Sequence, residues 1–149
     1  MKATFLNLDG TCNCLAARKA ARYLSAAYDK ALAPAGLRIT QFTILNKLAR
    51  LGPMTIKRLA AAMAMDRTTL ATNLKPLERD GLLVTAAAED RRATTIEITT
   101  AGNAKLEEAL PLWRLAQGKF EAGYGTEAAS ALRSALRGVL GAGLDPWAE

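Results

Sequence analysis

Hydrophobic residues recur at helical spacing over most of the chain. The first such stretch covers residues 14–32, is rich in alanine, and ends at the breaker segment 33–36. A second helix can begin with Thr40 as its N-cap and end before Pro53, and a third can begin after Thr55. The pattern therefore predicts one long helix followed by two short ones.

A fourth helix is predicted over residues 67–79, with Asp66 as its N-cap. Leu70, Leu74 and Leu77 lie at positions i, i+4 and i+7, which places them on one buried stripe. The opposite side of this helix is polar and carries Thr68, Thr72, Lys75 and Arg79.

The hydrophobic period changes from helical to alternating after Gly81. Residues 82–85 and 95–99 are typical of two short strands, and the second alternates clearly. The segment 86–93 between them is polar at its tip. We therefore expect a β-hairpin with a charged tip.

Two further helices are expected toward the C-terminus. Thr99 or Thr100 can cap a helix that runs to about residue 122, and Pro111 should kink it. Thr126 can cap the last helix, whose apolar face carries Leu132, Leu136, Val139 and Leu140.

The order of these elements defines the expected fold class. Two short helices joined by a tight turn and followed by a charged hairpin form a winged helix-turn-helix. The chain shows no internal repeat and no low-complexity linker, so the elements are expected to form one unit. The predicted fold is therefore mainly α with a small β-hairpin wing.

Composition favours a nucleic-acid partner over catalysis. The net charge is +6 and the chain has no histidine, which removes histidine-based triads and histidine metal sites. No phosphate-binding or dinucleotide motif occurs, so we expect no enzyme and no cofactor. No apolar stretch is long enough for a membrane span and no secretory signal is evident, so the expected location is the cytoplasm, without a membrane partner.

The fourth helix is the candidate DNA-reading element. Small hydroxyl and amide side chains with few carboxylates suit a surface that approaches DNA closely. The alternative is an ordinary polar helix face, which the hairpin behind the helix makes less plausible. The candidate DNA-binding residues of this helix are Arg67, Thr68, Thr69, Thr72, Asn73 and Lys75.

The hairpin tip supplies the second candidate element. Arg91 and Arg92 can enter a narrow minor groove, where the negative potential is enhanced. Asp90 is expected to orient an arginine through a charge-assisted hydrogen bond. The alternative is a solvated turn.

Several motifs together indicate a known family. They are Leu37 with Thr40-Gln41-Phe42, Leu59-Ala60, Arg67-Thr68-Thr69, Leu77-Glu78-Arg79-Asp80-Gly81-Leu82, Asp90-Arg91-Arg92 and Ile98-Thr99-Thr100-Ala101-Gly102. The chain resembles the MarR family of bacterial regulators over nearly all of residues 12–140. This resemblance implies a homodimer, more often a repressor, on a near-palindromic double-stranded operator. It also implies dimerisation helices at about 12–36 and 103–140 and a DNA-binding lobe at about 37–102. Many relatives have an arginine where this chain has Thr72.

Two cysteines near the N-terminus suggest one possible signal. Cys12 and Cys14 precede Arg18 and Lys19 at a predicted helix start, an environment that favours the reactive thiolate. Cys14 matches the reactive cysteine of the organic-peroxide-sensing branch of the family, and Tyr28 matches one of its tyrosines. Arg18 and Ile39 stand where that branch has two more. The alternatives are a small core hydrophobe at Cys14 and, less plausibly, a metal site.

A small aromatic or phenolic effector is the other possible signal. Arg18, Arg22, Tyr28 and Trp113 could line its pocket, although helical spacing equally places Tyr28 and Trp113 in a core. Two other functional classes stay open: a cysteine-based redox protein, and a winged-helix module for protein–protein interaction.

Overall fold

The computed structural model describes residues 4–87 and 93–148. Its elements confirm the predicted class, because helices dominate and a small three-stranded antiparallel sheet accompanies them. In chain order they are α1 (Leu8–Thr11), α2 (Asn13–Leu32), the 3-10 helix η1 (Ala33–Ala35), α3 (Ile39–Leu51), β1 (Met54–Thr55), α4 (Ile56–Met63), α5 (Arg67–Arg79), β2 (Leu83–Ala87), β3 (Thr94–Ile98), α6 (Thr100–Tyr124) and α7 (Thr126–Val139).

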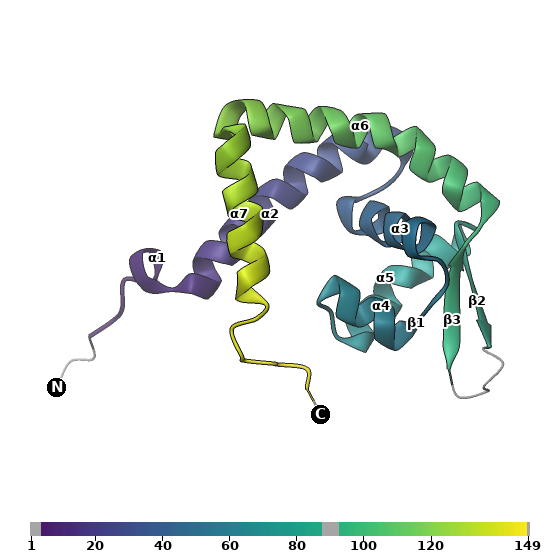
Figure 1. Ribbon diagram of the computed structural model, residues 1–149, viewed down its shortest axis with the longest axis horizontal. Coiled ribbons are helices and arrows are strands. Elements are labelled where there is room, and N and C mark those ends of the chain that lie inside the picture. Colours follow the sequence, from purple (N-terminus) through teal and green to yellow (C-terminus); the bar gives the residue numbers. More distant parts are fainter. Residues whose placement is uncertain (1–3, 88–92, 149) are drawn as a thin grey trace.

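The elements form a lobe and a helical arm (Figure 1). Helices α3, α4 and α5 lie together with the sheet in the lobe, while α2 and α6 pack against each other above it. Helix α7 turns back from the end of α6, and α1 extends away from the lobe at the N-terminal end of α2. No helix in residues 4–87 and 93–148 combines the length and the apolar character that a membrane span needs.

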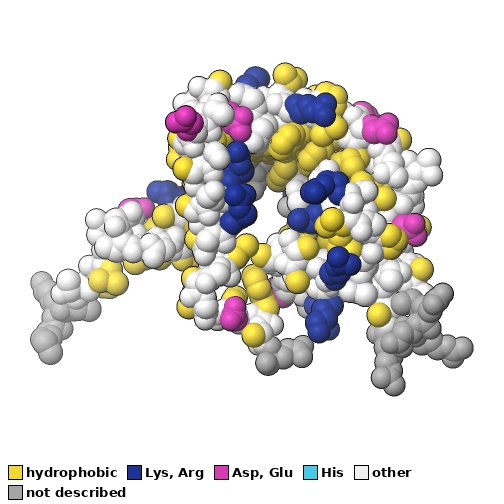
Figure 2. Space-filling model, viewed as in Figure 1, with side chains coloured by type: hydrophobic (Ala, Val, Ile, Leu, Met, Phe, Trp, Pro, Cys, Tyr) yellow, Lys and Arg dark blue, Asp and Glu magenta, His cyan; other side chains and the backbone are white. Residues whose placement is uncertain are grey.

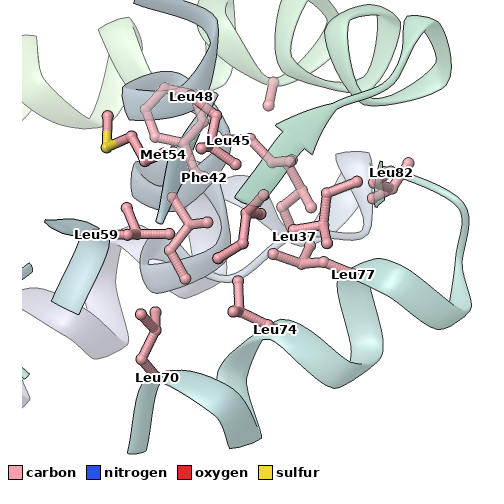
Figure 3. Close-up of a cluster of buried hydrophobic side chains, with 14 of the residues drawn as sticks. Leu37, Phe42, Leu45, Leu48, Met54, Leu59, Leu70, Leu74, Leu77 and Leu82 are labelled. Atoms are coloured by element: carbon pink, nitrogen blue, oxygen red, sulfur yellow. The ribbon is translucent and has the colours of Figure 1, made fainter. Parts of the chain in front are cut away.

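The core sits inside the lobe and fixes the orientation of α5. Leu70, Leu74 and Leu77 are buried as predicted and point into the cluster that contains Leu59 of α4 and side chains of α3 (Figure 3). Full burial of a leucine side chain stabilises the fold by roughly 2 kcal/mol. Trp113 of α6 stacks on Phe42 of α3, with ring centroids 6.1 Å apart. The buried stripe therefore turns the opposite face of α5 outward.

The sheet contains one strand that the sequence pattern does not reveal. Strand β3 is central, and β1 and β2 pair with it in antiparallel fashion. Met54 of β1 lies opposite Ile96, and Leu83 of β2 lies opposite Ile98. Strand β1 has only two residues, too few to show an alternating pattern. The two predicted strands are present, with bounds shifted by one or two residues.

Three of the five predicted N-caps are correct, and the N-caps predicted for α3 and α7 are wrong. Thr55, Asp66 and Thr99 each accept a hydrogen bond from the first turn of their helices. Helix α3 begins at Ile39, before Thr40, because Asp29 of α2 accepts the Ile39 N–H at 2.7 Å. Gln41 also accepts the Arg38 N–H, at 2.9 Å.

Two smaller differences concern α7 and the N-terminus, whereas α6 agrees with the prediction. Gly125 is the N-cap of α7, and Thr126 lies inside the helix. The short helix α1 was not expected from the pattern. Helix α6 continues through Pro111, as expected, and changes direction along its length (Figure 1).

The turn between α4 and α5 contains a strained alanine, which gives a stability prediction. Ala64 has φ 51°, in the left-handed region that costs a residue with a Cβ roughly 1–2 kcal/mol. Ala64→Gly relieves this strain but also raises the conformational entropy of the unfolded chain. We expect the first effect to be larger, so the free energy of unfolding should rise by about 0.5–1 kcal/mol. Urea denaturation measures the change.

Ala62, on the exposed side of α4, is the matched control for this substitution. Glycine inside a helix costs about 1 kcal/mol, so Ala62→Gly should be destabilising. If both substitutions destabilise equally, the left-handed conformation of Ala64 carries no strain that glycine can relieve.

Candidate nucleic-acid interface

The start of α5 is held by a double cap. The Asp66 carboxylate accepts the Thr69 N–H at 2.7 Å, and the Thr69 hydroxyl donates to the other carboxylate oxygen at 2.8 Å. These bonds hold the pKa of Asp66 below its usual value, with the backbone bond as the larger cause. Asp66 therefore stays ionised at neutral pH, and the first turn of α5 is rigidly positioned.

The six predicted residues of α5 occupy an outward face and its two flanks. Thr68, Thr72 and Lys75 are exposed on the side opposite the leucine stripe. The Thr72 hydroxyl donates to Thr68 O at 3.1 Å, and Asn73 Nδ2 donates to Thr69 O at 2.8 Å. The other two predicted residues, Arg67 and Thr69, lie in the exposed first turn.

A groove of about 640 Å³ opens where α4, α5 and β3 begin. Among the residues that the structure describes, two cations line it, Lys57 from α4 and Arg67 from α5. Lys57 is not among the residues predicted from the sequence, although a cation in the first turn of a capped helix is a usable signal. The remaining lining residues are Thr55, Ile56, Thr68, Ala71, Ala93 and Thr94.

The wing is tied to α5 by a side-chain bond. The Thr85 hydroxyl of β2 donates to Glu78 Oε1 near the end of α5, at 2.8 Å. Thr95 of β3 donates to Ala86 O of β2 at 3.2 Å. The predicted wing residues Asp90, Arg91 and Arg92 lie outside the described residues.

The base of the wing is locked to the start of α6. The Thr99 hydroxyl donates to Gly81 O at 2.6 Å and accepts the Gly102 N–H at 3.0 Å. Thr99 N also donates to Leu82 O at 3.1 Å. A Cβ added at Gly102 would lie 2.0 Å from Leu82 O, so only glycine fits this approach.

Comparisons with known proteins identify the family of this fold. The model of the MarR family matches residues 35–93, which include α3, α4, α5 and β2. The M. tuberculosis transcriptional regulator MosR, in a crystal structure with DNA, is 38% identical, with a TM-score of 0.78. That alignment covers 89% of this chain and 99% of MosR. This chain belongs to the MarR family of transcriptional regulators.

Two further proteins extend the comparison, one by sequence and one by fold. The uncharacterised HTH-type transcriptional regulator YwoH of Bacillus subtilis is 29% identical over 90 residues, which cover 60% of this chain. The aligned region spans 66% of YwoH, just under two thirds. The alignment with a mutant MarR of E. coli, bound to operator DNA, covers 92% of this chain and 99% of that chain, at 18% identity. Its TM-score of 0.80 shows a shared fold.

The thiol region of this MarR-family chain lies at the start of α2. Cys12 is the N-cap, and its Sγ accepts the Leu15 N–H at 3.3 Å. Cys14 is exposed, as is Arg18 one turn further along. Tyr28 lies on the same helix about 20 Å from Cys14, at a rise of about 1.5 Å per residue. Within one chain, the predicted redox or effector residues therefore fall into two separate places.

Tyr28 belongs to a half-buried pocket of about 230 Å³ between α2, α3 and α6. Burial raises the pKa of the Tyr28 hydroxyl, and the nearby Glu121 carboxylate adds to the shift while Arg133 opposes it. Tyr28 is therefore neutral and donates to Gln117 Oε1. The lining residues are Leu24, Ser25, Tyr28, Ile39, Trp113 and Gln117.

A chain of polar contacts leads from this pocket to α7. Gln117 Nε2 donates to Glu121 Oε1 at 3.2 Å, one turn further along α6. Arg133 of α7 forms an ion pair with the same oxygen at 3.2 Å. The contacts connect a pocket wall to the helix that follows the arm.

Proposed function

We propose that this MarR-family regulator binds duplex DNA in a sequence-specific manner and acts as a repressor. One observation carries the proposal: the outward polar face of α5 lies beside a groove lined by Lys57 and Arg67. A B-DNA major groove of about 12 Å admits one α-helix, and cations beside it neutralise phosphates. The crystal structure of the 38% identical MosR in complex with DNA supports the same assignment.

The elements receive distinct roles in this proposal. Thr68, Thr72 and Lys75 reach base edges in the major groove, with Thr69 and Asn73 on the flank. Lys57 and Arg67 contact phosphates from the groove beside α5. The wing carries Arg91 and Arg92 into the minor groove, and Asp90 orients them.

A second copy of this chain is the proposed partner of the arm. Leu136, Val139 and Leu140 at the end of α7 are 47%, 63% and 68% exposed in the single chain. Figure 2 also shows hydrophobic side chains (yellow) over α1 and along the lower part of α7. Regions 12–36 and 103–140 would intertwine in the dimer, and residues 37–102 would form each DNA-binding lobe. The operator is then a near-palindrome.

Salt dependence of binding tests this proposal. We expect the affinity for the DNA beside the gene that encodes this protein to fall steeply as the salt concentration rises, because phosphate contacts release counterions. Fluorescence anisotropy with a labelled duplex measures the affinity, and sedimentation velocity measures the dimer. A monomer, or binding that does not change with salt, would contradict the proposal.

A ligand in the Tyr28 pocket is one proposed release signal. The lining combines apolar and aromatic side chains with Ser25, Tyr28 and Gln117, which suits a small aromatic or phenolic effector. Such a ligand would compete with Gln117 for the Tyr28 hydroxyl and so disturb the contacts that reach α7.

Thiol oxidation is the other proposed signal. An organic peroxide would oxidise the exposed Cys14 thiolate to a sulfenic acid and be reduced to an alcohol. Condensation with a second thiol, from Cys12, the partner or a small thiol, would then form a disulfide and release water. Cys12 would have to leave its N-cap position to react with Cys14, which would unwind the first turn of α2.

Cys14→Ser separates the two signals. We expect this variant to bind DNA like the wild type and to lose release by organic peroxide, while any release by phenolic acids persists. Anisotropy with peroxide or phenolic acid added to the preformed complex measures both responses. An equal peroxide response in the wild type and the variant would exclude Cys14 as the sensor.

A further inference from the structure

The central turn of α5 offers an acceptor and a methyl group at an exposed position, Thr72. The Thr72 hydroxyl has one hydrogen, and it donates that hydrogen to Thr68 O inside the helix. The oxygen of Thr72 therefore meets an approaching molecule as an acceptor, beside the side-chain methyl. Thr72 lies one turn after Thr68 and nearly one turn before Lys75, in the middle of the outward face.

Asn73 on the flank presents a related pattern. One hydrogen of its amide is used by Thr69 O, at 2.8 Å. Within the described part of the chain, no donor contacts its Oδ1. One amide hydrogen and the amide oxygen remain, a combination that matches N7 and N6 of adenine.

Base edges in the major groove differ in the hydrogen-bond donors, acceptors and methyl groups that they present. Adenine N6 and cytosine N4 are the donors there, whereas guanine presents the acceptors O6 and N7. Thymine alone adds a methyl group. A side chain that combines an acceptor with a methyl therefore complements an adenine–thymine pair at both of its distinguishing groups.

We propose that Thr72 is the specificity-determining residue of the central turn and selects an adenine–thymine pair. Adenine N6 donates to Thr72 Oγ1, and the thymine methyl packs against Thr72 Cγ2. Adenine N6 has one free hydrogen in the major groove, so Asn73 is expected to match an adenine of a neighbouring base pair and not the one that Thr72 reads. This inference rests on the proposed DNA binding and goes beyond it, because it specifies the base pair that the centre of α5 reads.

Selection from a pool of random duplexes tests the inference. We expect the wild type to enrich adenine–thymine over guanine–cytosine roughly tenfold at the position under the centre of α5. Thr72→Val keeps the shape and a methyl but removes the acceptor, so the preference for adenine should fall to about twofold. Thr72→Ser keeps the acceptor and removes the methyl, so adenine and cytosine should become equivalent. Thr72→Arg supplies two donors and should switch the preference to guanine.

The readouts separate this inference from DNA binding itself. Thr72 is exposed, so all three variants should fold, which circular dichroism checks. Thr72→Val and Thr72→Ser should keep the salt dependence of the wild type, because phosphate contacts are unchanged. If the wild type enriches guanine–cytosine there, or if these two variants leave the preference unchanged, the inference fails and DNA binding stands. If the wild type binds no duplex, both proposals fail.

Discussion

The double substitution Lys57→Ala with Arg67→Ala is expected to weaken duplex binding about 100-fold near physiological salt. Both cations line the groove beside α5, one from each of two helices. Each lost phosphate contact lowers the slope of log affinity against log salt by about 0.9. The two protomers of the proposed dimer together lose four contacts, so the slope should fall by about 3.6. The loss should be similar for all sequences, because phosphates carry no base information. Anisotropy titrations at several salt concentrations measure both quantities.

A second pair of exposed cations controls for net charge. Lys30 of α2 and Arg114 of α6 lie outside this groove, and their joint substitution by alanine removes the same charge. This control should change affinity only slightly and leave the salt slope nearly intact. Both control residues lie in the arm of the proposed dimer, so sedimentation velocity first checks that the control variant is still a dimer. Equal losses in two dimeric variants would show that overall charge, not the groove, drives binding.

Gly102→Ala is expected to lower the free energy of unfolding by about 2–3 kcal/mol. The new Cβ would lie 2.0 Å from Leu82 O and 2.6 Å from Ile98 Cγ1. The backbone cannot move away cheaply, because Thr99 bonds both Gly81 O and Leu82 O at this point. The cost of the clash exceeds the gain of about 1 kcal/mol that alanine brings to a helix interior.

Gly118 provides the matched control in the same helix. Among the described residues of the single chain, a Cβ at Gly118 would meet nothing within 4 Å, so Gly118→Ala should stabilise the protein by about 0.5–1 kcal/mol. Urea unfolding curves of the two variants should therefore shift in opposite directions. A stable Gly102→Ala variant would show that the wing base can relax away from α6.

Local signals made α5 predictable from the sequence. Its cap at Asp66 and its stripe of Leu70, Leu74 and Leu77 involve residues within one or two turns of each other. The start of α3 at Ile39 was predictable only in part, because Gln41 accepts the Arg38 N–H locally but the acceptor for the Ile39 N–H is Asp29 of α2. Strand β1 likewise exists only through pairing with β3, which lies far along the chain.

The candidate site was predictable as a set of residues on one helix, but not as a surface. The groove needs the first turns of α4 and α5 and the start of β3 in one place, so Lys57 could not be found from α5 alone. Cys14 and Tyr28 were grouped by family position, yet α2 holds them far apart in one chain. The roles of Arg91 and Arg92 stay predictions, since both lie outside the described residues.

Hydroxyl-radical footprinting of the DNA that flanks the gene tests the central claim most directly. Two α5 helices in successive major grooves predict two protected half-sites related by two-fold symmetry, about 10 base pairs apart from centre to centre. Protection should weaken as salt rises. Protection without two-fold symmetry, or no protection at concentrations where the dimer forms, would contradict the account.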